Sequence, residues 1–365
     1  MRILVTGGAG FIGSNFVRLE LARHDDEVVV LDKLTYAGNP ANLREFEQNP
    51  RYSFILGDIA DAEVVATAMD GIDAVVNFAA ESHVDRSIID PGAFITTDVQ
   101  GVYILLEAAR RQQIERFLHV STDEVYGEVP NGSVSEDAPL RPRSPYAASK
   151  AGGDLLVYAY FVTYGLPTLV SRGSNTFGPY QYPEKLIPVM ITEALDGRSV
   201  PVYGRGQQVR DWLAVEDHCS AIDHILRHGA VGEAYNVGGG NEYQNLDVVE
   251  RILDALGRPR SLISYVPDRP GHDIRYSVDS TKLFQLGWMR AHTFDEALDA
   301  TVRWYVENDG WWRPLKEDRD YRAYFQRNYE ARGEQGPGAR GQGLGLTKPR
   351  LPTPDPRPPG GRSWP

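Results

Sequence analysis

Two groups of polar residues in the first half of the chain could do acid–base chemistry, and the first consists of Thr122, Asp123 and Glu124. They directly follow residues 117–121, whose apolar character predicts a buried strand. An open α/β sheet presents catalytic groups at the carboxyl ends of its strands, where two carboxylates could act as general acid and general base. Such a sequence is also typical of a solvated turn or a helix cap, so this pattern alone leaves both interpretations open.

The second group is Tyr146 and Lys150, which stand four residues apart at the start of a segment, 146–164, with apolar residues at helical spacing. On a helix the phenol and the ammonium group would share one face. A nearby cation stabilises a phenolate, so we expect Lys150 to lower the pKa of Tyr146. Tyr146 would then be a usable base near neutral pH.

The N-terminus carries the pattern of a dinucleotide-binding unit. Residues 2–6 read as a strand, and the glycines Gly7, Gly10 and Gly13 follow at three-residue intervals before a predicted helix that ends near residue 22. Glycines at this spacing allow a tight turn and a close approach of the backbone to a pyrophosphate at the helix N-terminus. A second strand, 27–31, ends at Asp32, whose carboxylate is expected on an adenosine ribose and would repel a 2′-phosphate. These features predict binding of NAD in preference to NADP, although the neighbouring Lys33 leaves room for NADP.

Further strands and helices alternate along the chain and predict an α/β fold with a Rossmann-type, doubly wound parallel sheet. Residues 53–56 and 74–78 read as buried parallel strands, with Asp58 and Ile59 after the first and Ala79 and Ala80 after the second. The first pair would lie beside an adenine and the second along the nicotinamide half, unless they are ordinary polar strand ends. Other predicted strands are 168–171 and 200–203, and other predicted helices are 93–111, 184–195 and 216–227.

The chain resembles the extended short-chain dehydrogenase/reductase superfamily, and within it the 4,6-dehydratases that act on dTDP-glucose. The resemblance spans about residues 1–332 and is carried by the segments 6–13, 32–39, 79–87, 121–127, 146–150, 178–188 and 268–272. The glycine-rich loop and the Tyr-x-x-x-Lys pair identify only the superfamily. The Thr-Asp-Glu group and the Pro-Glu-Lys-Leu-Ile-Pro segment at 183–188 are more discriminating, since epimerases of the superfamily usually lack that carboxylate pair.

The resemblance implies a site in three parts. The catalytic residues would be Thr122, Asp123, Glu124, Tyr146 and Lys150. Contacts with NAD would come from Gly7, Gly10, Phe11, Ile12, Gly13, Asp32, Lys33, Leu34, Thr35, Asp58, Ile59, Phe78, Ala79, Ala80, Ser82, Thr97, Tyr146 and Lys150. The nucleotide-diphosphate sugar would contact Ser82, Thr122, Asn175, Glu184, Lys185, Leu186, Pro201, Tyr203, Arg210, Asn245, Arg269 and His272.

The second half of the chain supplies basic groups that could converge on a diphosphate, because guanidinium and ammonium groups match phosphate oxygens. These residues are Lys185, Arg205, Arg210, Arg269 and Arg275, and scattered surface cations are the alternative. Where the family generally reads Ser-Asn-Asn-Tyr-Gly, this chain has Thr176 in place of an amide and Phe177 in place of a tyrosine. The two changes put contacts at that end of the pocket in doubt.

Composition excludes several classes of protein. The 365 residues include 42% hydrophobic residues and carry a net charge of −12, so we expect a large core and no nucleic-acid partner. A single cysteine, Cys219, excludes an internal disulfide and reads as structural. We find no membrane span and no signal peptide, and expect a cytoplasmic enzyme. His224 and His228 have ligand spacing, but no carboxylate or cysteine completes a familiar pattern, so no metal is predicted.

The predicted organisation is an NAD-binding domain over residues 1–170, a smaller nucleotide-sugar-binding lobe over 171–332 that interleaves with the last strands of the sheet, and a flexible Gly-, Pro- and Arg-rich tail over 333–365. Seven aromatic residues between Trp304 and Phe325 are expected to pack a C-terminal subdomain. The exposed faces of helices 93–111 and 146–164 could pair in a homodimer, or their aromatics such as Tyr103 and Tyr158 could be core.

The expected reaction oxidises C4 of a nucleotide-linked hexose, eliminates water between C5 and C6 and then reduces C6 with the same bound NAD. Tyr146 would take the C4 hydroxyl proton with Lys150 supporting it, and Thr122 would orient the C4 oxygen. Glu124 would remove the C5 proton while Asp123 protonates the leaving hydroxyl. An epimerase, a decarboxylase or another nucleotide-sugar dehydratase is the enzymatic alternative, and a non-catalytic NAD-binding regulator is the alternative from another class.

Overall fold

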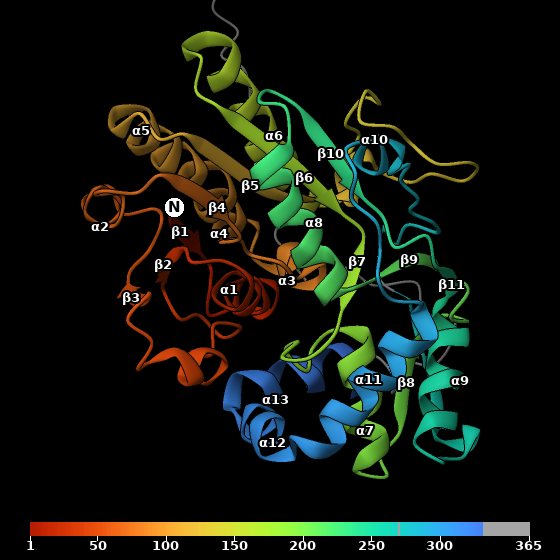
Figure 1. Cartoon of the computed structure of the whole chain (residues 1–365). Helices are drawn as coiled ribbons and strands as arrows, with labels where there is room; N and C mark the ends of the chain where they lie inside the picture. Colours follow the sequence, from red (N-terminus) through yellow and green to blue (C-terminus); the bar gives the residue numbers. More distant parts are fainter. Residues whose placement is uncertain (269–270, 331–365) are drawn as a thin grey trace, which may run out of the picture.

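A parallel sheet of seven strands, in the order β10-β6-β5-β4-β1-β2-β3, forms the centre of the molecule (Figure 1). The computed structural model describes residues 1–268 and 271–330. Every neighbouring pair of strands is parallel. The strands are β1 (Arg2–Thr6), β2 (Glu27–Asp32), β3 (Tyr52–Leu56), β4 (Ala74–Asn77), β5 (Arg116–Thr122), β6 (Thr168–Gly173) and β10 (Ala234–Val237). The predicted doubly wound Rossmann-type sheet is confirmed, and its order reverses between β1 and β4, where such sheets bind ligands.

Helices cover both faces of this sheet because side chains alternate along each strand. Ile3 and Val5 of β1 pack in one core cluster with helices α1 (Phe11–Arg23) and α8 (Val215–His228). Leu4, between them, packs in another cluster with α2 (Ala62–Ala68), α5 (Val102–Gln112) and α6 (Pro145–Tyr164). Strands buried on both faces are continuously apolar, as the sequence of β1 predicts.

Strand β3 corrects one expectation, since it lies at the edge of the sheet and is not buried. Phe54 is 37% and Leu56 is 66% exposed. The apolar run at 53–56 indicates a strand, but a local sequence does not reveal which strand ends the sheet.

The helix predicted at 93–111 is interrupted. It consists of α4 (Pro91–Ile95), a π-helical turn η2 (Thr96–Gly101) and α5. A π turn inserts an extra residue and redirects side chains, often at functional sites, and here it buries Thr97 and Asp98. Before it, α3 (Val84–Ile89) follows the loop after β4.

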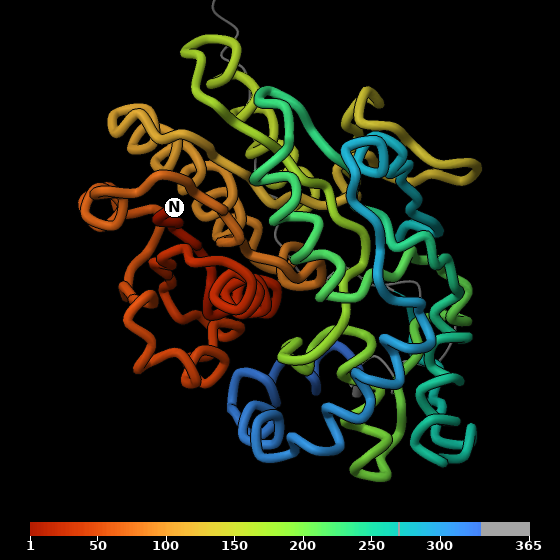
Figure 2. Tube along the Cα trace, in the orientation of Figure 1, coloured from red at the N-terminus to blue at the C-terminus, as the bar shows by residue number. Residues whose placement is uncertain are grey.

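A smaller lobe lies beyond the carboxyl edge of the sheet, and Figure 2 shows that its segments are coloured from yellow-green to blue, although the green chain of α8 and β10 belongs to the large sheet. It contains a three-stranded sheet, β11-β9-β7, and a two-stranded sheet, β12-β8. The strands are β7 (Asn175–Phe177), β8 (Val200–Tyr203), β9 (Val209–Ala214), β11 (Glu242–Gln244) and β12 (Ile263–Val266). The helices of the lobe are α7 (Leu186–Leu195), α9 (Asn245–Ala255), α11 (Phe294–Glu307), α12 (Asp309–Glu317) and α13 (Arg319–Phe325). Helix α10 (Thr281–Gln285) instead packs beside β10 of the large sheet. Besides η2, short helical turns occur in both parts of the molecule: η1 (Pro40–Phe46) and η3 (Asp123–Tyr126) follow strands β2 and β5 of the large sheet, and η4 (Arg260–Leu262) and η5 (Gln326–Glu330) come later in the chain.

The lobe has its own core, in which the expected aromatic cluster takes part. Tyr305 and Trp312 are almost fully buried there, with Trp304 and Trp311 packed against them. The chain crosses between the two parts more than once, because β10 returns to the large sheet beside β6 after β7, β8 and β9 have been formed. The domain boundary at residue 170 stays a prediction.

Some expectations concern residues that lie outside the described part of the chain, namely the tail at 333–365 and Arg269. Within the described residues, no helix combines the length and the apolarity needed to cross a membrane.

Candidate active site

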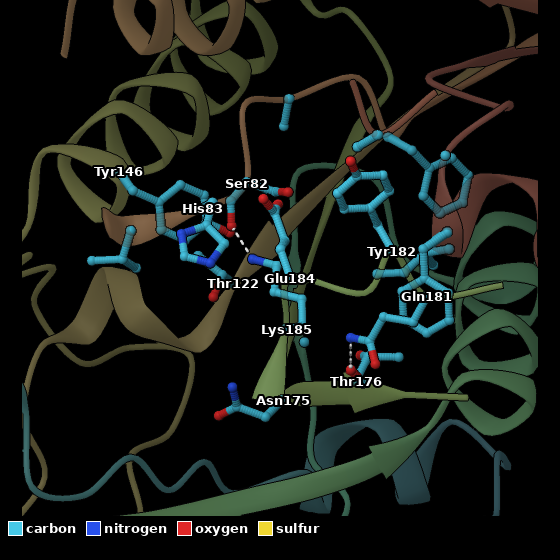
Figure 3. A pocket seen from close by; sticks show the side chains of 18 of the residues that line it. Ser82, His83, Thr122, Tyr146, Asn175, Thr176, Gln181, Tyr182, Glu184 and Lys185 are labelled. Carbon is cyan, nitrogen blue, oxygen red and sulfur yellow. Dashed lines mark hydrogen bonds between the residues drawn. The ribbon is translucent and has the colours of Figure 1, made fainter. Parts of the chain in front are cut away.

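A cavity of about 400 Å³ lies at the carboxyl edge of the large sheet, between the sheet and the smaller lobe. Its walls contain residues from the loops after β1, β2, β4 and β5, from α6, and from α7, β8 and β9 of the lobe. Figure 3 shows Tyr146 and Thr122 facing Lys185 and Asn175 across part of this space. Every predicted site residue lines this cavity except Leu34 and the undescribed Arg269.

The glycine-rich loop forms a cradle that side chains would fill. Gly7 has a φ of +69°, and a Cβ there would lie 2.6 Å from the backbone nitrogen of Ala79. A Cβ on Gly13 would lie 2.4 Å from the carbonyl oxygen of Gly7. Helix α1 begins beside this cradle, and its N-cap residue, Gly10, has no side chain that could cap the helix. Backbone N–H groups at the helix start are thus available to phosphate oxygens, so the residues fit a dinucleotide.

Asp32 is held at the end of β2 with its carboxylate oriented by the backbone. It accepts hydrogen bonds from the N–H groups of Ala9 (2.9 Å) and Leu34 (2.8 Å). Leu34 therefore acts through Asp32 and does not line the cavity. Burial raises the pKa of Asp32, although these two bonds oppose the shift.

Lys33 gathers the polar groups at the same end of the cavity. Its ammonium group donates to the Thr97 hydroxyl (3.1 Å) and lies 3.5 Å from an oxygen of Asp58 and 3.8 Å from Glu81. Because Lys33 follows β2, Asp58 follows β3 and Glu81 follows β4, these contacts connect the three loops.

Thr122, Asp123 and Glu124 satisfy both interpretations of their sequence. Thr122 ends β5 and caps the short helix η3, since its hydroxyl accepts from the Glu124 N–H (3.3 Å). All three residues nevertheless line the cavity. The turn that caps η3 therefore also places the carboxyl groups of Asp123 and Glu124 at the cavity.

Asp123 is an acid held in an unfavourable environment for its charged form. It is 3% exposed, and burial, with Glu124 and Asp211 nearby, raises its pKa well above the usual range. The Thr122 hydroxyl donates to one oxygen at 3.3 Å. Within residues 1–268 and 271–330, the other oxygen has no hydrogen-bond partner. A carboxyl group in this setting favours its protonated form.

Tyr146 and Lys150 begin helix α6, which Ser144 caps by accepting from the Ala147 N–H (3.1 Å). The expectation that Tyr146 has a lowered pKa is wrong for the structure as described. Burial, Glu124 and Asp98 raise its pKa well above the usual value, while a hydrogen bond with Thr122 opposes the rise. Lys150 is itself buried with a lowered pKa, and its ammonium group donates to the Val120 carbonyl oxygen (2.8 Å).

Asp98 is a buried residue that the sequence did not single out. One oxygen accepts from the Glu81 N–H (3.0 Å) and the other from the Ser149 hydroxyl (2.7 Å). Burial raises the pKa of Asp98 to about 6, and the charge of Lys150 opposes the rise. Asp98 thereby ties the loop after β4 to the helix that carries Tyr146. Asp98 lies in the π turn η2, and no sequence pattern marks that turn.

The lobe side of the cavity brings together some of the predicted basic groups. Lys185 donates to the carbonyl oxygen of Ser82, shown as a dashed line in Figure 3, and Arg210 donates to that of Asp273 (2.9 Å). Arg275 instead pairs with Glu242 at 2.7 Å, and Arg205 is exposed. Neither of these last two lines the cavity.

Polar contacts also hold the remaining lobe residues in place. The Arg86 guanidinium group pairs with Glu184 (3.0 Å), and the Tyr203 hydroxyl donates to Asp85 (2.9 Å). His83 accepts from the Asp85 N–H (3.2 Å), and its other nitrogen lies 2.9 Å from the Tyr324 hydroxyl. Both ring nitrogens of His83 therefore have hydrogen-bond partners.

The two departures from the family pattern have different environments. Thr176 lines the cavity, and its hydroxyl lies 2.8 Å from a ring nitrogen of His218. Burial lowers the pKa of His218 to about 4, so this histidine is neutral near pH 7. Phe177 is 1% exposed and packs edge-on against Trp212 and Phe294. The change from tyrosine to Phe177 therefore removes a hydroxyl group at a buried core position. The change to Thr176 alters the wall of the cavity.

Fold and site together define an NAD-dependent enzyme of the extended short-chain dehydrogenase/reductase type, with a carboxylate pair beside its Tyr-x-x-x-Lys pair. Residues 4–301 match the family model described as GDP-mannose 4,6 dehydratase, and the chain belongs to this family. It is 51% identical over 322 residues to dTDP-glucose 4,6-dehydratase of Streptomyces niveus. The aligned region covers 87% of this chain and 96% of that protein.

Solved structures give the same result. The dTDP-glucose 4,6-dehydratase of Streptomyces venezuelae, crystallised with NAD bound, has a TM-score of 0.85 and 52% identity over 87% of this chain and 100% of its own. The UDP-glucose 4-epimerase of Thermus thermophilus, in complex with NAD, has a TM-score of 0.79 and 34% identity over 84% of this chain and 100% of its own. The resemblance to the dTDP-glucose 4,6-dehydratases is confirmed, and the epimerase shares the fold at lower identity.

Proposed function

We propose that the protein converts dTDP-glucose to dTDP-4-keto-6-deoxyglucose and water, with NAD as its cofactor. The observation that carries this proposal is the carboxylate pair Asp123 and Glu124, which shares one cavity with Tyr146 and Lys150. Relatives at 51% and 52% identity carry the name of this enzyme. An epimerase needs only the oxidation at C4 and its reversal, so it has no use for an additional acid and base.

The cofactor would be held by the cradle at Gly7 and Gly13, by Asp32 on the adenosine ribose, and by Lys150 and Tyr146 at the reactive end. Bound NAD supplies an acceptor for the hydrogen and electron pair of C4, and later returns them to C6. Asp32 favours a free ribose hydroxyl over a 2′-phosphate, so NAD is preferred to NADP.

Tyr146 is the proposed base for oxidation. Its oxygen takes the proton of the C4 hydroxyl as C4 loses its hydrogen, and the C4–O bond becomes a carbonyl. Thr122, hydrogen-bonded with Tyr146, orients the C4 oxygen. Since burial and carboxylates raise the pKa of Tyr146 in the protein alone, the proposed activation depends on Lys150 and on the positive charge that the cofactor brings.

Glu124 and Asp123 are proposed to carry the elimination. The C4 carbonyl acidifies the C5 proton, and Glu124 removes it. The C6–O bond breaks as Asp123 gives its proton to the leaving hydroxyl, so that water departs and a C5–C6 double bond remains. The hydrogen from C4 then adds to C6, and a proton returns to C5. Redox state and atoms balance, because glucose loses only water.

The substrate diphosphate is proposed to contact Lys185, Arg210 and Arg269, and His272 is proposed to contact the same nucleotide sugar. The nucleotide would extend along Leu186, Pro201, Tyr203 and Asn245, while Ser82, Asn175 and Glu184 face the sugar. This arrangement is supported by the presence of all the described residues among them in one cavity with the catalytic group.

We also propose a homodimer in the cytoplasm. The outer face of α6 exposes Leu155, Tyr158 and Val162, each about 60% exposed, and α5 exposes Tyr103. Exposure of Tyr103 and Tyr158 excludes them from the core of one chain, whereas Tyr160 is buried. Two copies paired through α5 and α6 would cover this apolar face by a closed two-fold contact.

The proposal is tested by incubating the purified chain with dTDP-glucose and identifying the product by mass spectrometry and NMR. We expect loss of one water and a 4-keto-6-deoxy sugar without added reductant. A product of unchanged mass with inverted C4 would support the epimerase, and bound NAD without any turnover would support the regulator.

A further inference from the structure

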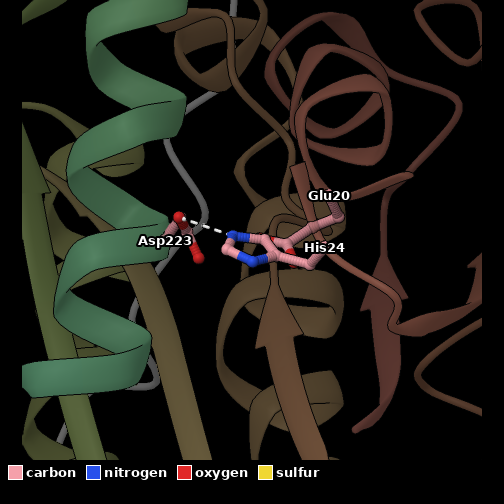
Figure 4. Close-up of side chains that lie close together, drawn as sticks. All are labelled: Glu20, His24 and Asp223. Carbon is pink, nitrogen blue, oxygen red and sulfur yellow. Dashed lines mark hydrogen bonds and ion pairs between the residues drawn. The ribbon is translucent and has the colours of Figure 1, made fainter. Parts of the chain in front are cut away.

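A second group of chemically competent side chains lies away from the cavity, between helices α1 and α8 (Figure 4). It consists of Glu20 and His24 from the end of α1 and Asp223 from α8. One oxygen or nitrogen of each residue lies within 4.8 Å of those of the other two. Since α1 begins at the carboxyl edge of the sheet and ends at the opposite edge, none of the three lines the cavity.

The nitrogen Nε2 of His24 lies 3.1 Å from Oδ2 of Asp223. Two ligand atoms at this separation, each about 2.0–2.1 Å from a common metal ion, subtend an angle of roughly 100° at the ion. Such an angle suits tetrahedral and octahedral sites. The third donor, Glu20, offers a carboxylate oxygen within 4.8 Å of both atoms.

Arg227 accounts for some of the carboxylate oxygens but not for all. Its guanidinium group contacts Oε2 of Glu20 (2.7 Å), Oδ2 of Asp26 (2.6 Å) and Oδ1 of Asp223 (2.5 Å). The other oxygen of Asp223 faces His24. Each carboxylate can therefore bridge between the guanidinium group and a second cation.

Glu20 supplies an independent reason to expect a second cation. Its side chain is fully buried, and Oε1 has no hydrogen-bond partner among the described residues. An unpaired buried carboxylate oxygen is costly, since desolvation penalises its charge. Burial, the negative charge of Asp223 and a hydrogen bond that a protonated Glu20 makes with Asp223 raise the pKa of Glu20 to about 8, whereas Arg227 lowers it. A proton is the competing occupant of this position.

We propose that Glu20, His24 and Asp223 bind a divalent transition-metal ion of the Zn²⁺ class. One imidazole nitrogen and two carboxylate oxygens suit zinc, manganese or cobalt better than a purely oxygen-liganded ion such as Mg²⁺. His24 is 29% exposed on its side chain, which gives the ion a path from solvent and a place for a water ligand.

The site would act on structure and not on the reaction. It would join the end of α1, the helix whose beginning forms the dinucleotide cradle, to α8 on the same face of the sheet. Metal binding would therefore stabilise the packing of these helices, and activity of the enzyme would not depend on it.

The experiment uses the untagged full-length chain, freed of metal with a chelator and dialysed against Zn²⁺ at pH 7.5. We expect one bound zinc ion per chain and a rise in Tm with zinc concentration. Co²⁺ should give a visible absorption band from the same site. Glu20→Gln and His24→Asn should each weaken zinc binding at least tenfold and leave dehydratase activity unchanged.

His292→Asn is the matched control, because His292 also pairs with a buried carboxylate, Asp217, at 3.0 Å, but the part of the chain that the structure describes places no third donor there. It should bind zinc as the unaltered chain does. Circular dichroism shows whether each variant is folded. The inference is overturned if the unaltered chain binds no zinc, which would mean that a proton and Arg227 satisfy the cluster, or if folded Glu20→Gln and His24→Asn variants bind zinc with unchanged affinity.

Discussion

Adjacent carboxyl groups can do opposite proton work only if their environments differ. Asp123 is 3% exposed and has a raised pKa, partly because Glu124 is its neighbour. Glu124 is only half-buried and lines the same cavity. Crowding raises one pKa relative to the other, so a single site can hold a protonated acid and an ionised base. The direction of the Asp123 shift agrees with its proposed role as the acid.

Glu124→Gln and Asp123→Asn should each still oxidise C4 in a single turnover, seen as absorbance of the reduced cofactor, because neither group is needed for that step. Overall product formation should fall by about 10²-fold or more, the range for a lost general acid or base. In D₂O, Asp123→Asn should exchange the C5 hydrogen of the trapped 4-keto sugar, and Glu124→Gln should exchange it much more slowly. Exchange at the unaltered rate in Glu124→Gln would place the base elsewhere.

Asp98 gives a prediction about pH. Its pKa is raised to about 6 in the folded chain, so the folded state binds more protons than the unfolded state between about pH 4 and 6. The free energy of unfolding contributed by Asp98 therefore falls as the pH rises through this window. Asp98→Asn removes this loss while an amide still bridges Glu81 and Ser149. The variant should gain on the order of 2 kcal/mol relative to the unaltered chain between pH 4 and pH 7.

Denaturant unfolding at several pH values measures this difference, with Asp299→Asn, an exposed residue on α11, as the control. A difference between Asp98→Asn and the unaltered chain that does not change with pH would contradict the assignment. The same variant should shift the acidic limb of the rate profile to lower pH, since the charge of Asp98 helps to raise the pKa of Tyr146.

Among the structural elements, the glycine-rich turn and helix α1 depend most on backbone proximity. A Cβ on Gly13 would meet the carbonyl oxygen of Gly7 at 2.4 Å, and backbone cannot move aside as a side chain can. Gly13→Ala should cost about 2 kcal/mol or more and reduce bound NAD per purified chain at least tenfold. Gly310→Ala on α12 is the control, because its Cβ would meet nothing within 4 Å. Full NAD occupancy in Gly13→Ala would show that the cradle is not the binding site.

The sequence predicted most elements because their signals are local. Apolar runs located β1, β2 and β5, and helical spacing located α6, whose Tyr146 and Lys150 share the cavity as expected. Sheet order is not local, so the exposed edge position of β3 could not be predicted. The π turn was missed because six residues are too few to show a periodicity of their own within a longer helical pattern, and Asp98 was missed with it.

Site residues in the second half were harder to predict because they come from separate loops. Lys185 and Arg210 reach the cavity while Arg275 does not, although all three are basic residues in a substrate lobe. No sequence pattern distinguishes Arg275 from Lys185 and Arg210. Arg275 forms an ion pair with Glu242, and this partner comes from β11, a separate segment of the chain. The resemblance to a known family excluded Arg275 from the expected site where composition did not.

At the scale of the whole molecule, the exposed apolar face of α6 predicts association. Leu155→Asp places a charge at a residue that is 60% exposed, so the fold should survive while pairing is lost. Sedimentation should show the unaltered chain at twice 40.6 kDa and the variant at that mass. Leu56→Asp on β3, 66% exposed, should remain a dimer. An unaltered chain that sediments as a monomer would refute the proposed pairing.

The most direct test of the whole account follows one hydrogen atom through the reaction. dTDP-glucose labelled with deuterium at C4 is converted by the purified chain without added cofactor, and the product is examined by mass spectrometry and NMR. Because oxidation, elimination and reduction occur on one bound sugar with one bound NAD, the deuterium should be found at C6 of the 4-keto-6-deoxy product. A product that has lost the label, or an epimer that carries it at C4, would contradict the account.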